Sequence, residues 1–174
     1  MTVKCRKPAG FTPTESIRWD SSWPELVGDD ERHRLFSYLE ERFGISENIF
    51  DDYLMFKRKS NWWLLKETPR IVFGAQLKVS QVGMKAFQRV GAFVKPGTRM
   101  IQSFGHKATK AKFGLNKLQL VKLLAGDTIP ANFDLDEGYL ILSLHDRHIL
   151  GLGLLIDGRI RSQISRKALK EVML

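Results

Sequence analysis

The chain has 174 residues, of which 43% are hydrophobic and 27% charged, and its net charge is +9. This composition is too apolar for a disordered chain and is sufficient for one compact core or two small ones. Cys5 is the single cysteine, which excludes an intramolecular disulfide and a zinc site built from several cysteines. No signal-peptide pattern opens the chain and no window reaches the ~18 apolar residues of a membrane span. We therefore expect a cytoplasmic monomer without membrane partners.

The first half predicts a helix followed by antiparallel strands. A helix is predicted over Asp29–Phe43, where apolar residues recur at helical spacing and Gly44 follows the last turn. Two β-rich runs, Tyr53–Arg58 and Trp62–Lys66, are joined by a short polar turn and predict a hairpin. Two tryptophans adjacent on a strand place one ring on each face, so one is expected in the core and the other half-exposed. The segments expected to continue the sheet are Arg70–Phe73 and Leu77–Val79.

The second half has short apolar runs separated by frequent glycines. Strands are predicted over Val90–Val94 and Lys112–Leu115, and a helix is predicted between Asn116, as its N-cap, and Gly126. The apolar face expected for this helix consists of Leu118, Val121, Leu123 and Leu124. Three closing strands are predicted over Tyr139–Leu142, Ile149–Ile156 and Ile160–Ile164, the last two joined by a tight turn at Asp157-Gly158. We expect an N-terminal α+β domain over residues 1–85 and a second domain over residues 86–174.

Charge is strongly segregated along the chain. Residues 68–126 contain eleven Lys and Arg and no Asp or Glu, whereas residues 20–52 contain ten carboxylates and three arginines. The alternative interpretation is that these charges are scattered over a solvated surface and have no partner. However, like charges over so long a stretch repel one another unless an anionic partner neutralises them. The pattern favours a nucleic-acid partner for the basic stretch. The acidic helix Asp29–Phe43 is instead expected to offer a face to a basic ribosomal or assembly protein.

Several short motifs of the second half follow one another in a fixed order. They are Lys95-Pro96-Gly97-Thr98, Phe104–Lys110, Gly138–Leu142, Gly151-Leu152-Gly153, and Gly158-Arg159-Ile160 with Ser165-Arg166. In this order they resemble a PUA domain, the small RNA-binding fold of pseudouridine synthases and archaeosine transglycosylases. The whole chain further resembles two groups of proteins: the pre-PUA plus PUA factors of large-subunit ribosome assembly, and the C-terminal tail of Nol-Nop-Sun type rRNA methyltransferases. The resemblance implies an α+β fold, with a small pre-PUA-like α/β domain followed by a PUA-like β-barrel.

The candidate RNA-binding residues lie mainly around the glycines of the basic stretch. Glycines allow backbone amides to approach phosphates, and lysines displace counterions. Arg159 and Arg161 share one strand face and are expected to extend the same cleft. Phe104 is expected in the core, and Arg166 is equally interpretable as the solvated side of a terminal helix. The predicted site residues are Lys95, Arg99, Gly105, His106, Lys107, Lys110, Lys112, Arg159, Arg161 and Arg166.

No catalytic motif is recognised in the chain. Gly151-Leu152-Gly153 lacks the third glycine and the distant acid of a dinucleotide site, and the donor-binding and cysteine motifs of the methyltransferases are absent. The histidines form no recognisable metal pattern. We therefore expect a non-enzyme without metal or cofactor that binds structured rRNA or tRNA as an accessory factor in ribosome biogenesis, rRNA processing or RNA modification. Two alternatives stay open: an RNA-modifying enzyme with an unrecognised active site, and an adaptor that recruits a separate methyltransferase.

Overall fold

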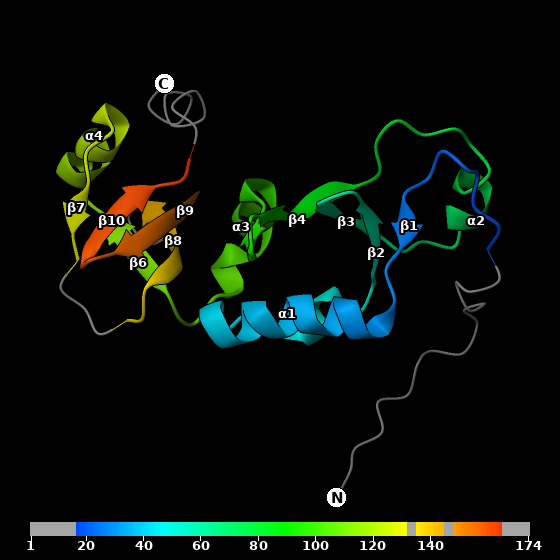
Figure 1. The fold of residues 1–174 in the computed structure, drawn as a ribbon, viewed down its shortest axis with the longest axis horizontal. Helices are drawn as coiled ribbons and strands as arrows, with labels where there is room; N and C mark the ends of the chain where they lie inside the picture. The colour runs from blue at the N-terminus through cyan, green and yellow to red at the C-terminus, as the bar shows by residue number, and fades with distance from the viewer. Residues whose placement is uncertain (1–16, 132–134, 145–147, 165–174) are drawn as a thin grey trace, which may run out of the picture.

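The protein has a mixed α+β fold with two five-stranded sheets. The structure is a computed structural model, and it describes residues 17–131, 135–144 and 148–164. The two sheets lie side by side along the long axis of the molecule, with helix α3 between them and α1 along one side (Figure 1). Within the described residues, no helix is both long and apolar enough to cross a membrane.

The first sheet is an antiparallel meander in the order β1-β2-β3-β4-β5. Its strands are β1 (Glu25–Leu26), β2 (Tyr53–Arg58), β3 (Asn61–Lys66), β4 (Met84–Val90) and β5 (Phe93–Pro96). Helix α1 (Asp29–Phe43) has the bounds predicted from the sequence, because its stripe of Leu35, Phe36, Leu39 and Phe43 is fully buried. Gly44 ends α1 with φ +65°, a left-handed conformation that glycine adopts without cost. The short helix η2 (Glu47–Phe50) leads into β2.

The second sheet has the order β6-β8-β9-β10-β7 and curls into a half-barrel. Strand β6 (Lys112–Leu115) runs parallel to β8 (Gly138–Leu144), and the other pairs are antiparallel. The remaining strands are β9 (His148–Ile156), β10 (Arg159–Ser162) and β7 (Ile129–Pro130). Helix α4 (Lys117–Ala125) begins at the predicted N-cap Asn116, where the side chains and backbone amides of Asn116 and Gln119 form a reciprocal capping box.

Helix α3 (Thr98–Phe104) and the following turn η3 (Gly105–Lys107) join the two sheets. Met100 and Ile101 of α3 are each 1% exposed, and they belong to a single hydrophobic core that includes Phe87 of the first sheet and Ile141 of the second. The boundary expected between residues 85 and 86 falls inside β4, so it divides a strand of the first sheet. The first sheet instead ends at Pro96, and both sheets contribute to one core.

Three local expectations were wrong. Arg70–Phe73 is not a strand, since Ile71–Gly74 forms the one-turn helix α2, and Leu77–Val79 is irregular. Residues 90–94 do not form one strand, because Gly91, with φ +60°, makes a turn between β4 and β5. In the first case strand propensity yielded to tertiary packing, since Ile71 is buried in the one-turn helix.

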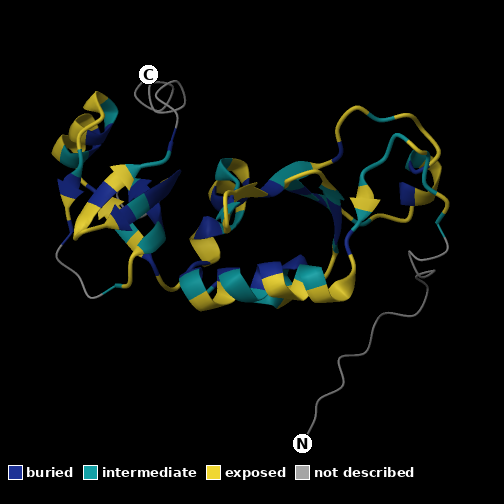
Figure 2. Cartoon of the chain, in the orientation of Figure 1, coloured by how far each residue is buried: buried dark blue, intermediate teal, exposed yellow. Residues whose placement is uncertain are grey.

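The predicted apolar face of helix α4 was also wrong in part. The helix buries Leu120 and Leu123, while Leu118 and Val121 are 77% and 53% exposed (Figure 2). Residues 120, 123 and 124 follow the three-and-four spacing of one helix face, which turns residues 118 and 121 outward.

A second, smaller apolar cluster covers the other face of the first sheet. Trp19 and Trp23 pack on Phe56, with ring centroids 5.1 and 5.5 Å from it. As predicted, the paired tryptophans of β3 divide between the faces: Trp62 is 1% exposed and Trp63 is half-buried. Phe104 also packs inward, since its ring meets Phe50 edge-on at 4.9 Å, as expected for a core residue.

Candidate nucleic-acid interface

Most basic side chains of residues 68–126 are exposed, and none of them forms an ion pair with a described carboxylate. Nine of the eleven are exposed, and Lys85 and Lys95 are half-buried. The ion pairs formed among described residues are His33–Glu47, Arg34–Glu31 and Lys57–Glu31, and all three involve α1. Across the described ranges, none of the eleven cations lies within ion-pair distance of a carboxylate. Their charge is therefore left for solvent or for an external anion.

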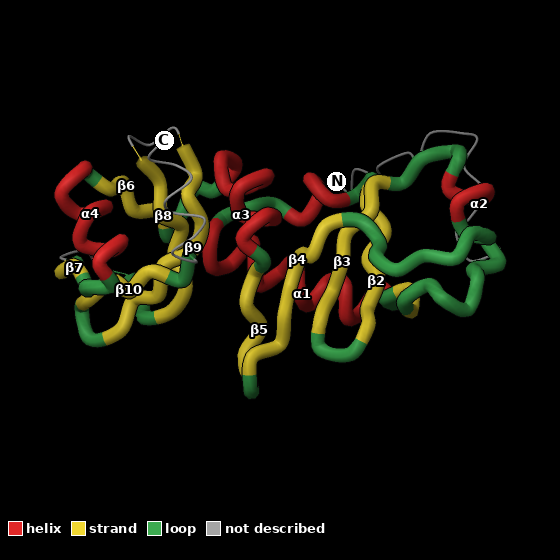
Figure 3. Tube along the Cα trace, turned by 90° about the horizontal axis from the view of Figure 1, so that it is seen from above, coloured by secondary structure: helices red, strands yellow, loops and turns green. Residues whose placement is uncertain are grey.

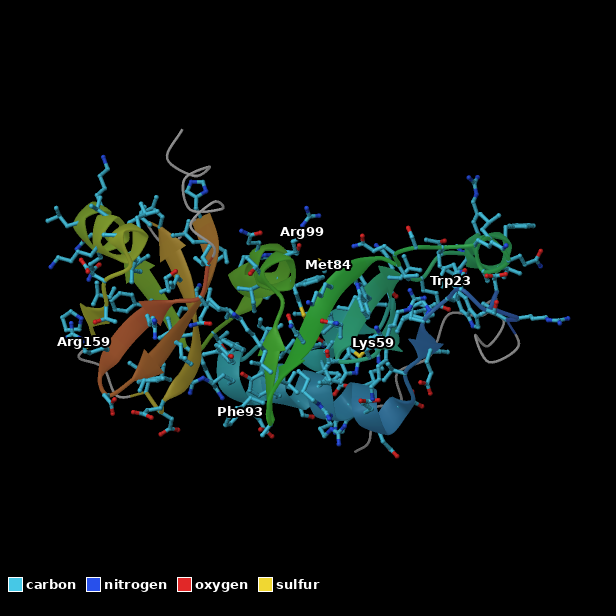
Figure 4. The ribbon with its side chains drawn as sticks, turned by 45° about the horizontal axis from the view of Figure 1, so that its top comes forward. Trp23, Lys59, Met84, Phe93, Arg99 and Arg159 are labelled. Carbon is cyan, nitrogen blue, oxygen red and sulfur yellow. The ribbon has the colours of Figure 1, made fainter. Side chains whose placement is uncertain are left out.

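Helix α3 and turn η3 present three of the predicted residues. Arg99, His106 and Lys107 are all exposed, and Arg99 projects away from the body of the molecule (Figure 4). The helix that carries them is held firmly, because its buried face lies in the core and Gln102 donates to the carbonyl oxygen of Leu150 at 3.0 Å. A rigid support lowers the entropic cost of holding these cations in one arrangement.

Gly105 lies under this surface and not on it. The residue is buried, and a Cβ at this position would lie 3.2 Å from Cγ2 of Ile149 and 3.5 Å from Cδ1 of Ile141. Its small size therefore allows η3 to approach β8 and β9 closely. The close approach accounts for this glycine by packing, and its predicted contact with phosphate stays a prediction.

Lys110 and Lys112 follow η3 at the C-terminal end of α1. The backbone amides of Thr109 and Lys110 both donate to the carbonyl oxygen of Phe43 at 3.0 Å, which satisfies the last turn of the helix. Both lysine side chains are exposed. Lys110 also borders an open hollow with mixed charge, whose other lining residues are Tyr38, Glu41, Arg42, Ala111, Leu135 and Asp136.

Tyr38 supplies an uncharged hydroxyl to this hollow. Burial raises the pKa of Tyr38 to about 12, although the nearby charge of Arg42 acts in the opposite direction. The phenol therefore stays protonated at neutral pH. Because two carboxylates accompany the two cations here, the hollow is a weaker anion site than the α3–η3 surface.

Lys95 lies where the first sheet meets the second. Its Nζ donates to Oε1 of Gln163 at 3.1 Å and lies 5.9 Å from the ring centroid of Tyr139. Burial against these groups lowers the pKa of Lys95. Gln163 follows β10, and Arg161 lies two residues earlier on the same side of that strand. Lys95 of β5 thus contacts the segment that directly follows β10.

The remaining predicted residues are placed apart from this junction or are not described. Strand β10 alternates as predicted, with Arg159 and Arg161 exposed and Ile160 buried. Arg159 is bound to Thr128, from Nε to Oγ1 at 2.7 Å, and lies well away from Arg99 (Figure 4). The structure therefore places Arg159 apart from Arg99 of α3. Arg166 lies outside the described residues.

A small pocket beside Trp63 is lined by Pro24, Arg58, Ser80, Gln81 and Val82. Arg58 is the single ionisable residue in this lining, so acid and base groups do not converge there. Over residues 17–131, 135–144 and 148–164, no three His, Cys, Asp or Glu side chains are grouped to hold a metal ion.

Sequence analysis did not identify Phe93 as an exposed residue. Phe93 is 74% exposed at the tip of the β4–β5 hairpin, whereas the sequence placed it inside a strand. The available signal was Gly91, which indicated a turn before Phe93.

Comparison of the sequence with protein-family models and with curated proteins finds no match.

Proposed function

We propose that the protein binds structured RNA through the exposed cations of α3, η3 and the segment that follows them. The observation that carries this proposal is the row of exposed basic residues without carboxylate partners among the described residues, chiefly Arg99, His106, Lys107, Lys110 and Lys112. Such a surface neutralises phosphates and gains free energy from the release of their counterions. The resemblance of the second half to PUA domains favours RNA over other polyanions.

The acidic charge of α1 supports one orientation of the complex. Exposed carboxylates on this helix include Asp29, Asp30, Glu40 and Glu41, and they repel phosphate from that side of the molecule. RNA therefore approaches the α3–η3 surface. The α1 surface stays free for a basic protein, such as a ribosomal or assembly protein.

The biological role that fits these surfaces is that of a cytoplasmic, monomeric accessory factor in ribosome assembly or RNA modification. In this proposal the first sheet with α1 forms a pre-PUA-like unit, and the second sheet with α3 and α4 forms a PUA-like unit. RNA is recognised by its backbone and shape, because residues 95–112 offer four lysines and one arginine but a single glutamine and no asparagine for base edges.

Titration of the full chain with a folded rRNA fragment, at a series of salt concentrations, tests the proposal. We expect the logarithm of the association constant to fall linearly and steeply with the logarithm of salt concentration. Dextran sulfate serves as the control polyanion and should bind more weakly than RNA at matched charge. A salt slope near zero, or preference for dextran sulfate, would reject RNA binding by this surface.

A further inference from the structure

The β4–β5 hairpin carries an exposed aromatic ring beside cations. Phe93 is 74% exposed and lies on the same face of β5 as Lys95, whereas Val94 between them packs against the core. Across the hairpin, Phe93 pairs with Val90, which is 47% exposed, and Lys95 pairs with Gln88. The Cα atoms of Phe93 and Lys95 therefore lie about 7 Å apart along the strand.

The backbone that supports Phe93 is well anchored. The amide of Arg89 donates to the carbonyl oxygen of Ser60 at 2.7 Å, which joins this hairpin to the tip of the β2–β3 hairpin. On the opposite face Phe87 is completely buried. Figure 3 shows the β4–β5 hairpin projecting beyond the rest of the molecule, with its tip clear of other elements. The ring is thus presented on a fixed support and is open to a ligand.

The two hairpins at this end of the first sheet carry basic residues and no acidic ones. The stretches 53–66 and 84–97, which form the two hairpins, contain no carboxylate. Lys59 lies at the tip of the β2–β3 hairpin (Figure 4). Arg89 pairs with Val94 and therefore lies on the face opposite Phe93, with its guanidinium carbon 5.9 Å from the ring centroid of Trp62. Lys95 is thus the cation that shares a strand face with the ring. An exposed aromatic ring on a strand face that also carries a cation suits an unpaired nucleotide, because the base can stack on the ring while the cation neutralises an adjacent phosphate. A paired helix hides its base faces and would not use the ring.

We propose that Phe93 stacks on an unpaired nucleotide of the bound RNA while Lys95 and Arg161 contact the adjacent phosphates. The ammonium of Lys95 donates one hydrogen bond to Gln163 and retains two protons for a phosphate oxygen. This inference rests on the proposed RNA binding. It adds a contact on the first sheet that selects single-stranded segments of a structured RNA.

The test compares Phe93→Ala with Phe73→Ala in the full chain. Phe73 is a matched control, because it is 76% exposed and lies on α2 at the far end of the molecule (Figures 1 and 3). The probes are a short oligouridine and a fully paired RNA duplex without overhangs. We expect Phe93→Ala to weaken oligouridine binding about 5- to 100-fold, the range for loss of one stacked base. Duplex binding should be unchanged, as should both affinities of Phe73→Ala.

Phe93→Trp supplies the conservative variant, and it should retain or exceed the wild-type affinity for oligouridine while its fluorescence is quenched on binding. If the wild type binds neither RNA, the proposed function itself fails. If the wild type binds oligouridine and Phe93→Ala binds it equally well, or if Phe93→Ala weakens both RNAs alike, stacking by Phe93 is rejected while RNA binding stands. Equal losses in Phe93→Ala and Phe73→Ala would likewise reject it.

Discussion

Arg42 on α1 donates a hydrogen bond from Nε to the carbonyl oxygen of Tyr139 on β8 at 2.7 Å. Its NH2 group donates to the carbonyl oxygen of Asp136 at 2.8 Å. A helix that packs on the first sheet is thereby bound to a strand of the second sheet. These hydrogen bonds add to the contacts that the two sheets make through their shared core.

Replacement of Arg42 should therefore destabilise the whole protein. We expect Arg42→Ala to lower the free energy of unfolding by about 1–3 kcal/mol, because two backbone carbonyls lose charged donors. Urea unfolding followed by fluorescence measures the change. Arg34→Ala is the control, since the Arg34 side chain is 71% exposed and its ion pair with Glu31 spans 3.8 Å, so this change should be nearly neutral. Equal effects of the two variants would contradict the structural role of Arg42.

Gly97 should be intolerant of a side chain. A Cβ at this position would lie 2.4 Å from the carbonyl oxygen of Lys85, and backbone must move to relieve that overlap. We expect Gly97→Ala to cost about 1–3 kcal/mol of stability. Gly28→Ala has open space around the added methyl and should be close to neutral. Thermal unfolding of both variants checks the contrast, and a Gly97→Ala protein as stable as Gly28→Ala would refute the close approach.

Glu31 should make stability depend on acid pH. Burial raises the pKa of Glu31, but the hydrogen bond and charge of Lys57, together with the hydrogen bond of Trp62, outweigh it and lower the pKa below the ordinary 4.5. A carboxyl group with a lower pKa in the folded state stabilises the protein above its unfolded pKa. This contribution is lost as the pH falls through the folded-state pKa.

Glu31→Gln should therefore lower stability at neutral pH and have little effect well below the folded-state pKa. Urea midpoints measured across this range give the pH profile. Glu40→Gln, an exposed change on the same helix, controls for the loss of one negative charge. A constant difference between wild type and Glu31→Gln at every pH would contradict the linkage.

Local elements with strong signals could be predicted from the sequence. The apolar residues at helical spacing and the following Gly44 defined α1. Asn116 defined the start of α4, and Asp157-Gly158 defined the turn between β9 and β10. These signals act within a few residues. By contrast, Ile71–Gly74 has strand-like side chains, yet it forms a helical turn because Ile71 and Ala75 are buried against distant residues.

The candidate site was predictable in composition but not in arrangement. Segregated charge identified Arg99, Lys107 and Lys110 as exposed cations, since an acid-free segment offers no internal partners. The contact between Lys95 and Gln163 depends on how the two sheets meet, which no local pattern records. The shared core likewise depends on α3, whose sequence gives no indication of which sheet it covers.

The central claim is that the exposed cations of α3, η3 and the segment that follows them bind RNA, and not basic charge in general. Two double variants remove equal charge: Lys107→Gln with Lys110→Gln at this surface, and Lys117→Gln with Lys122→Gln on α4, where both lysines are also exposed. We expect the first to weaken binding of a folded rRNA fragment and to reduce the salt slope by roughly 0.7–0.9 per lysine, while the second leaves both nearly unchanged. Equal losses in the two variants, or a larger loss from the α4 pair, would contradict the account.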